Sequence, residues 1–253
     1  MVRMHGTKEF WLAALRTDGT AFRAAASGDV LSTPVPSCPE WTVEDLVRHL
    51  GAVYRYVRSH VSRGVITPPD QRVVMSDVPH GADALTWWDD QFQQLLALLD
   101  ALDPETPAYN WAPQSKKVAF WHRRMAHETA VHRWDAQFAL GRGEPVEAKL
   151  AADGVSEVLD TWLPAGRRQG PVDRTGVVQL YAVDVEQHWF VRLRGEGIAL
   201  LDTDTLLDTD DPHARVLAQG TASDLLLALY GRVLFDVLDV SGDAGLLESL
   251  RTG

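Results

Sequence analysis

Residues 42–57 read TVEDLVRHLGAVYRYV, and this stretch decides the fold class of the first part of the chain. Thr42 is a good helix cap, and the acid Asp45 three positions later gives a pattern much like a capping box. Apolar residues then recur at the i, i+3/i+4 spacing of one helical face, as Leu46, Val47, Leu50, Val53, Tyr54 and Val57. The stretch therefore predicts an amphipathic helix with a defined start.

Three more segments show the same helical period, at about residues 7–26, 82–102 and 118–140. The last of them ends at Gly141, which suits a helix C-terminus. A loop with Gly64 and two prolines over residues 63–79 separates the middle helices. Four amphipathic helices of this length predict a four-helix bundle.

The pattern changes near residue 143, where a further helix is predicted at about residues 147–163. Alternating, β-rich runs follow it, at residues 177–185, 188–193, 198–201 and 214–218. The chain then returns to a helical pattern from Thr221 to Leu234. We therefore expect two domains, a helical bundle over residues 1–145 and a smaller α+β domain over residues 146–253.

Composition excludes several classes of protein. The 253 residues are 45% hydrophobic and 23% charged, which is enough to bury a core. The formal net charge of −11 repels phosphate backbones, so a nucleic-acid partner is not expected. The single cysteine, Cys38, excludes an intrachain disulfide and a cysteine-based metal cluster.

The sequence also carries no apolar run long enough to span a bilayer, and residues 1–6 lack the apolar core of a signal peptide. We expect a cytoplasmic protein without a membrane partner, present as a monomer or weak oligomer.

The fourth predicted helix carries the best candidate for a metal site. Residues 121–135 read WHRRMAHETAVHRWD, in which Glu128 and His132 stand at i, i+4 and so lie on one helical face. A carboxylate and an imidazole placed in this way can share a metal ion, and His49 on the second helix is the best third ligand. Three protein ligands with an open position are typical of a catalytic zinc site.

The remaining histidines of this helix, His122 and His127, cannot face the same point, because a five-residue step turns the side chain by roughly 140°. Asp135, at i+3 from His132, could hold the other ring nitrogen of that histidine, and Asp45 could act in the same way on His49. The alternative is a solvated Glu–His pair, with His49 as a core histidine bonded to a carbonyl.

Three stretches resemble one known family. CPEWTVEDLVRHL at residues 38–50 is similar to the N-terminal motif of the mycothiol-dependent maleylpyruvate isomerase family, whose bundle is DinB-like. HETAVHRWD at residues 127–135 resembles its second motif, and QGTASDLLLALYGR at residues 219–232 its C-terminal signature. The three occur in the family's order and span nearly the whole chain, which makes the resemblance specific.

The resemblance implies zinc held by His49, Glu128 and His132, with mycothiol as the thiol cosubstrate. It also implies that Arg232 is a catalytic and cofactor-binding residue that holds an anionic group of the substrate or of the thiol. An arginine at a helix end can instead simply complement the helix dipole.

The expected activity is attack of an activated low-molecular-weight thiol on an electrophilic small molecule. A cis–trans isomerase would add the thiolate, allow rotation and eliminate it, whereas an S-transferase would leave the thiol attached. Two alternatives stay open: a metal-dependent hydrolase that uses bound water, and a non-catalytic binding or regulatory protein with the same fold.

Overall fold

The structure is a computed structural model that describes residues 6–68, 78–201 and 214–252. Residues 69–77 of the loop predicted at 63–79 lie outside this part. The chain divides into two compact units, with the break between Glu144 and Pro145. None of the described helices is long and apolar enough to cross a membrane.

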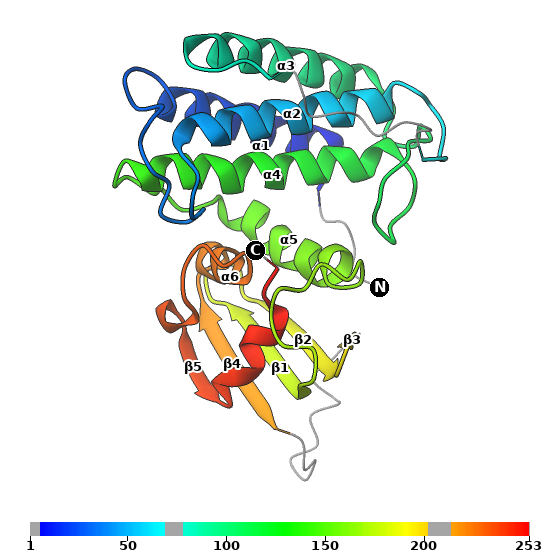
Figure 1. Cartoon of the computed structure of the whole chain (residues 1–253). Coiled ribbons are helices and arrows are strands. Elements are labelled where there is room, and N and C mark those ends of the chain that lie inside the picture. The colour runs from blue at the N-terminus through cyan, green and yellow to red at the C-terminus, as the bar shows by residue number, and fades with distance from the viewer. Residues whose placement is uncertain (1–5, 69–77, 202–213, 253) are drawn as a thin grey trace. The chain divides into compact units, whose positions relative to one another are not determined.

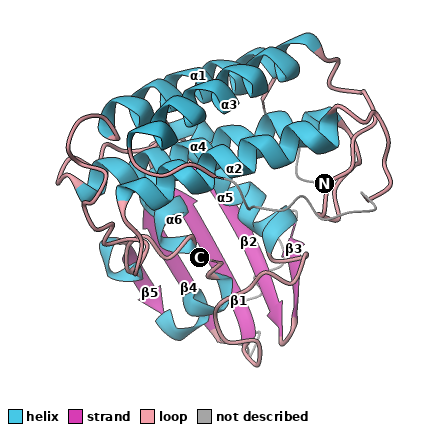
Figure 2. Ribbon diagram, turned by 45° about the horizontal axis from the view of Figure 1, so that its top comes forward, coloured by secondary structure: helices cyan, strands magenta, loops and turns pink. Residues whose placement is uncertain are grey.

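The first unit is a bundle of four α-helices in the described part of the chain (Figures 1 and 2), which confirms the predicted helical architecture. The helices are α1 Lys8–Ala25, α2 Val43–Val61, α3 Ala82–Ala101 and α4 Val118–Ala139. Helix α1 packs mainly on α4, and α2 packs on both α3 and α4. Their shared core includes Leu15, Phe22, Leu46, Leu50, Tyr54, Trp88, Leu95, Leu99, Trp121 and Met125.

Helix α2 forms as its sequence predicts. The Thr42 hydroxyl accepts a hydrogen bond from the Asp45 amide at 3.3 Å, and the Asp45 carboxylate accepts one from the Thr42 amide at 2.9 Å. This capping box satisfies two backbone N–H groups at the helix start. The apolar stripe that follows it is buried, and this fixes which face of α2 turns toward the core.

Helix α4 departs from the amphipathic pattern expected of it. Nearly every residue from Val118 to Ala136 is buried, and these include Arg123, Arg124 and Arg133. A buried charge is costly unless it is paired, so these arginines need partners within α4 or on a neighbouring helix. The predicted C-terminal glycine is confirmed, because Gly141 follows the helix with a φ of 69°.

The described residues of the second unit form an α+β domain with one mixed sheet of five strands, and the predicted α+β class is confirmed. The strand order is β3-β2-β1-β4-β5, and only the β1–β4 pair is parallel. The strands are β1 Thr175–Ala182, β2 Gln187–Arg194, β3 Gly197–Leu201, β4 Arg215–Gly220 and β5 Asp239–Gly242.

Two helices pack with this sheet. Helix α5, Ala148–Glu157, lies against α6, Ala222–Leu229, and the Trp189 indole N–H of β2 donates to the Ser156 hydroxyl of α5 at 2.9 Å. Helix α5 continues into a π-helical turn, Val158–Trp162, so the helix predicted to Leu163 changes its hydrogen bonding midway. Short 3-10 helices at Phe235–Val237 and Ala244–Leu250 complete the described unit.

The helix predicted from Thr221 to Leu234 is too long. It ends at Leu229, because Gly231 adopts a φ of 68° and the Arg232 amide turns back to the Leu227 carbonyl at 2.8 Å. Glycine tolerates this left-handed conformation, which closes the helix. Strand β5 and the two 3-10 helices were not predicted.

Candidate metal centre

Three side chains from two helices converge inside the bundle. His49 of α2 and Glu128 and His132 of α4 offer one ligand atom each, and these atoms lie within 4.8 Å of one another. Glu128 Oε1 is 3.3 Å from His49 Nε2 and 3.4 Å from His132 Nε2. The structure therefore brings together the three residues that the sequence named, although they come from segments almost 80 positions apart.

The local structure explains this convergence. Glu128 and His132 follow one another by a single turn of α4, so both point to the same side of that helix. His49 follows the buried pair Leu46 and Val47 of α2, and the packing of that stripe turns its imidazole toward α4. Glu128 is only 15% exposed, and so the pair is not a solvated surface ion pair.

Asp135 orients the His132 ring. Its carboxylate Oδ2 accepts from His132 Nδ1 at 2.9 Å, as the spacing predicted, and Asp135 is fully buried. With Nδ1 bonded to Asp135, the other ring nitrogen, Nε2, faces Glu128 Oε1 at 3.4 Å. Burial lowers the pKa of His132, but the Asp135 and Glu128 carboxylates outweigh it and raise the pKa above its usual value.

The same carboxylate fixes the chain segment before α2. Ser37 Oγ donates to Asp135 Oδ1 at 2.6 Å, and Cys38 Sγ lies 3.6 Å from Oδ2. Trp41, a few residues on, places its ring 5.0 Å from the His49 ring and stacks on that of His132 at 6.4 Å. Residues 37–41 thus form one wall of the centre.

Arg124 holds the remaining oxygen of the carboxylate ligand. It stands one turn before Glu128, is almost fully buried, and its Nη2 donates to Oε2 at 2.6 Å. Burial raises the pKa of Glu128, yet Arg124 and the two histidines outweigh it and hold that pKa well below the usual range. Glu128 is therefore ionised, and its Oε1 stays directed at the histidines.

A pocket of about 410 Å³ lies beside the centre and has His49 in its wall. Its other lining residues are Glu40, Trp41, Asp45, Arg48, Ala52 and Val78. In the part of the chain described, Asp45 does not bond to His49. Its Oδ2 accepts hydrogen bonds from the amide and the hydroxyl of Thr42, and its Oδ1 is 3.8 Å from Arg48. The expectation for Asp45 fails because the helix cap uses this carboxylate.

The other two histidines of α4 point elsewhere, as predicted. His122 Nε2 donates to the Leu99 carbonyl at 2.9 Å, and the buried His127 ring packs edge-on against Trp11. Neither ring joins the three ligand atoms.

Arg232 belongs to the second unit, directly after α6. Its Nη1 donates to the Tyr230 carbonyl at 3.0 Å, a contact with the end of the helix. Its proposed part in binding an anion stays a prediction.

Sequence reasoning missed Arg124 and Ser37 as supporting residues. Arg124 had a signal, since it precedes Glu128 by four positions and the i, i+4 rule that paired Glu128 with His132 applies equally to it. Ser37 had none, because its bond to Asp135 joins residues 98 positions apart.

A helical bundle with a partly buried cluster of two histidines and one carboxylate defines a class of candidate metal-binding proteins. Comparison with known proteins identifies the family. A family model described as "Mycothiol maleylpyruvate isomerase N-terminal domain" matches residues 12–137, and one described as "MDMPI C-terminal domain" matches residues 149–249. The chain belongs to the mycothiol-dependent maleylpyruvate isomerase family, which is a family of enzymes, and the resemblance seen in the sequence is confirmed.

Solved structures share the fold. The crystal structure of a mycothiol-dependent maleylpyruvate isomerase is 12% identical, covers 97% of both chains and gives a TM-score of 0.62. A second structure, of a histidine-to-alanine mutant of such an isomerase, has the same identity and coverage with a TM-score of 0.61. No curated protein matches the sequence.

Proposed function

We propose that this chain is a zinc enzyme that uses mycothiol to attack an electrophilic small molecule. The observation that carries the proposal is the convergence of His49 Nε2, Glu128 Oε1 and His132 Nε2 within 4.8 Å. Family membership supports the thiol, because mycothiol is named in the description of the matching family.

The residues present fit zinc. Two imidazole nitrogens and one carboxylate oxygen are a ligand set that catalytic zinc sites use, and three protein ligands leave a coordination position open. The single cysteine of the chain lies against Asp135 and is not one of the three ligand residues. When bound there, zinc would supply Lewis acidity that lowers the pKa of a thiol toward neutrality.

The surrounding residues would keep the ligands in place. Asp135 fixes the tautomer and the orientation of His132, and Arg124 keeps Glu128 ionised and leaves one of its oxygens for the metal. The Trp41 ring packs against both imidazoles, 5.0 Å from that of His49 and 6.4 Å from that of His132. We propose Arg232 as the residue that binds an anionic group of the substrate or thiol, on the strength of its position in the family's C-terminal signature.

Two reactions share this machinery. The solved structures that share the fold are of a mycothiol-dependent maleylpyruvate isomerase. As an isomerase, this chain would add the thiol to a cis double bond, allow rotation and release the thiol again, so that the thiol is regenerated. An S-transferase would differ only in the last step, because the new carbon–sulfur bond would persist. The proposal covers both reactions, and the product distinguishes them.

The test is a reaction of the zinc-loaded full chain with maleylpyruvate and mycothiol. We expect turnover only with both zinc and the thiol, and either the trans isomer or a thioether adduct as product. Turnover without any low-molecular-weight thiol would show that water is the nucleophile and would contradict the proposal. Arg232→Ala should raise KM and retain zinc, whereas Arg251→Ala, an exposed arginine near the same end of the chain, should leave KM unchanged.

A further inference from the structure

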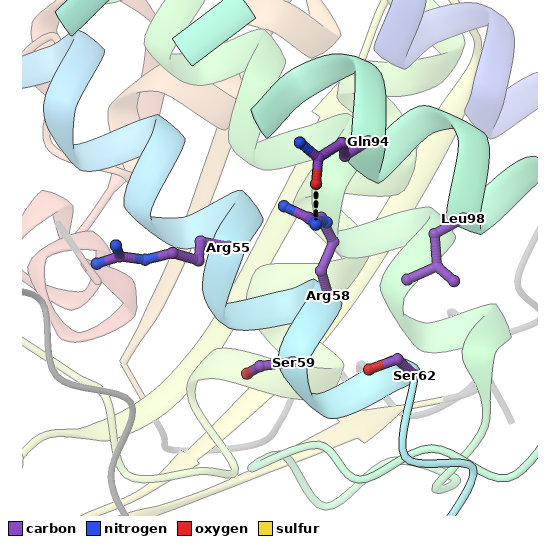
Figure 3. A pocket seen from close by; sticks show the side chains of 6 residues that line it. All are labelled: Arg55, Arg58, Ser59, Ser62, Gln94 and Leu98. Atoms are coloured by element: carbon purple, nitrogen blue, oxygen red, sulfur yellow. Dashed lines mark hydrogen bonds between the residues drawn. The ribbon is translucent and has the colours of Figure 1, made fainter. Parts of the chain in front are cut away.

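A second hollow lies in the bundle between α2 and α3, in a region that the metal centre does not use (Figure 3). Its volume is about 490 Å³. The residues that line it are Arg55, Arg58, Ser59 and Ser62 of α2 and Gln94 and Leu98 of α3. We call this hollow the α2–α3 groove.

The groove follows from the sequence of α2. Positions 55, 58, 59 and 62 have the i, i+3, i+4, i+7 spacing of one helical face, and positions 94 and 98 are one turn apart on α3. The two serines on this face are too small to fill the space between the helices. The metal ligand His49 lies nearer the start of α2.

Arg58 is held rigidly in the groove by neutral groups. Its Nη1 donates to Gln91 Oε1 at 2.8 Å, and its Nη2 donates to Gln94 Oε1. Both glutamines are fixed in turn, because Asp90 Oδ2 accepts from Gln91 Nε2 at 3.2 Å and from Gln94 Nε2 at 2.6 Å. A fixed guanidinium loses less freedom when it binds a ligand.

This arrangement leaves the charge of Arg58 without a direct counter-ion. No carboxylate of the described residues makes an ion pair with it, and two of its five N–H donors carry the bonds to the glutamines. Arg55 adds a second positive charge and stacks its guanidinium 5.6 Å from the Trp87 ring centre. Among the described residues, the lining of the groove holds two arginines and no acidic side chain, in a chain with a net charge of −11.

We propose that the α2–α3 groove binds a small oxyanion of the phosphate type. Figure 3 shows Arg58 directed toward Gln94 while Arg55 extends from α2 in another direction, so Arg58 is the principal contact and Arg55 adds longer-range attraction. The exposed Ser62 hydroxyl supplies a further donor, whereas the Ser59 hydroxyl already donates to the Tyr56 carbonyl at 2.7 Å. Leu98 offers an apolar surface to the rest of an organic phosphate.

The experiment is calorimetric titration of the full chain with inorganic phosphate at low ionic strength, where screening is weak. Wild type should show one saturable site. Arg58→Met keeps the aliphatic length but removes the charge, and it should weaken phosphate binding by roughly tenfold or more. Arg16→Met is the matched control, because this half-exposed arginine of α1 pairs with Asp100 outside the groove, and its affinity should equal that of wild type.

A filling variant makes the test specific to the groove. Ser62→Phe adds bulk at an exposed position and leaves both arginines in place, so it should abolish phosphate binding while the melting temperature is retained. The proposal is overturned if wild type shows no saturable site, if Ser62→Phe binds phosphate as wild type does, or if Arg16→Met weakens binding as much as Arg58→Met.

Discussion

Helices α2 and α4 supply all three candidate metal ligands, yet they are built on different principles. Helix α2 buries an apolar stripe in the core and keeps its charged residues outside the core. The i, i+3/i+4 spacing of that stripe is evident from the sequence. Helix α4 buries arginines, histidines and an aspartate along most of its length. Burial of the apolar stripe is therefore the main source of stability for α2, whereas α4 depends in addition on specific partners for buried polar groups, such as Asp18 for Arg133 and Asp135 for His132.

The difference is sharpest at the candidate metal centre. Two of these partnerships on α4 lie at the candidate centre, where Arg124 pairs with Glu128 and Asp135 with His132. The cost of burying polar groups is offset by contacts that also fix the ligands. Two kinds of helix therefore form one candidate site, and substitutions in the two helices should affect stability and zinc binding differently.

The largest effect on stability is expected at the buried ion pair of α4 with α1. Arg133 Nε donates to Asp18 at 2.9 Å, and both side chains are at most 10% exposed. Asp18→Ala strands a buried guanidinium and should lower the free energy of unfolding by about 3–5 kcal/mol. Urea denaturation of the variant measures this change.

The matched control is Asp89→Ala, which breaks an ion pair of similar geometry between Asp89 and Arg23. Those side chains are 43% and 35% exposed, so the loss should stay below about 1 kcal/mol. If both variants lost the same free energy of unfolding, the burial of the Arg133–Asp18 pair would not make it more important for stability than the exposed pair.

A smaller effect is expected where α4 supports its own ligand. Asp135→Asn removes the negative charge behind His132 and should weaken zinc binding by about 10- to 100-fold. Competition with a chromogenic chelator measures the affinity. Asp45→Asn is the control, because Asp45 lies beside His49 but bonds to Thr42, and it should bind zinc as wild type does. A wild-type affinity in Asp135→Asn would remove Asp135 from the account of the centre.

The smallest effect is expected at the start of α2. Thr42→Ala deletes the side-chain cap and should cost about 1 kcal/mol of stability, seen as a lower melting temperature. Zinc affinity should not change, because the packing of the apolar stripe on the core, rather than the cap, positions His49. Thr20→Ala in the exposed middle of α1 controls for the loss of a hydroxyl and should be almost neutral. A loss of zinc in Thr42→Ala would mean that the cap positions the ligand.

Much of the fold could be predicted from the sequence, and how well each helix or strand was predicted depends on how local its signal is. The capping box placed the start of α2 at the correct residue, because that signal is local, whereas the apolar stripe was followed only to Val57 and the helix runs on to Val61. The end of α6 was predicted too late, since the apolar pattern runs on past Gly231 and only the backbone angle there stops the helix. Strand β5 is short and mostly exposed, so it carries no alternation strong enough to detect.

The candidate site likewise contains residues that the sequence could predict and contacts that it could not. His49, Glu128 and His132 follow from helical spacing together with the bundle and the family motifs. The hydrogen bond of Ser37 to Asp135 and the ring contacts of Trp41 with the imidazoles depend on how a loop folds over α4, which no local pattern specifies. The choice of Asp45 failed because one carboxylate had two possible partners and the nearer helix cap used it.

Zinc content is the most direct test of the central claim that His49, Glu128 and His132 form one metal centre. Full-length wild type, loaded with zinc and dialysed, should retain one zinc ion per chain by elemental analysis. His49→Ala and His132→Ala should each lose it, because two remaining ligands hold zinc poorly, while His80→Ala, at an exposed histidine bonded to Glu44, should keep it. Full occupancy in either ligand variant, or no bound zinc in wild type, would contradict the account.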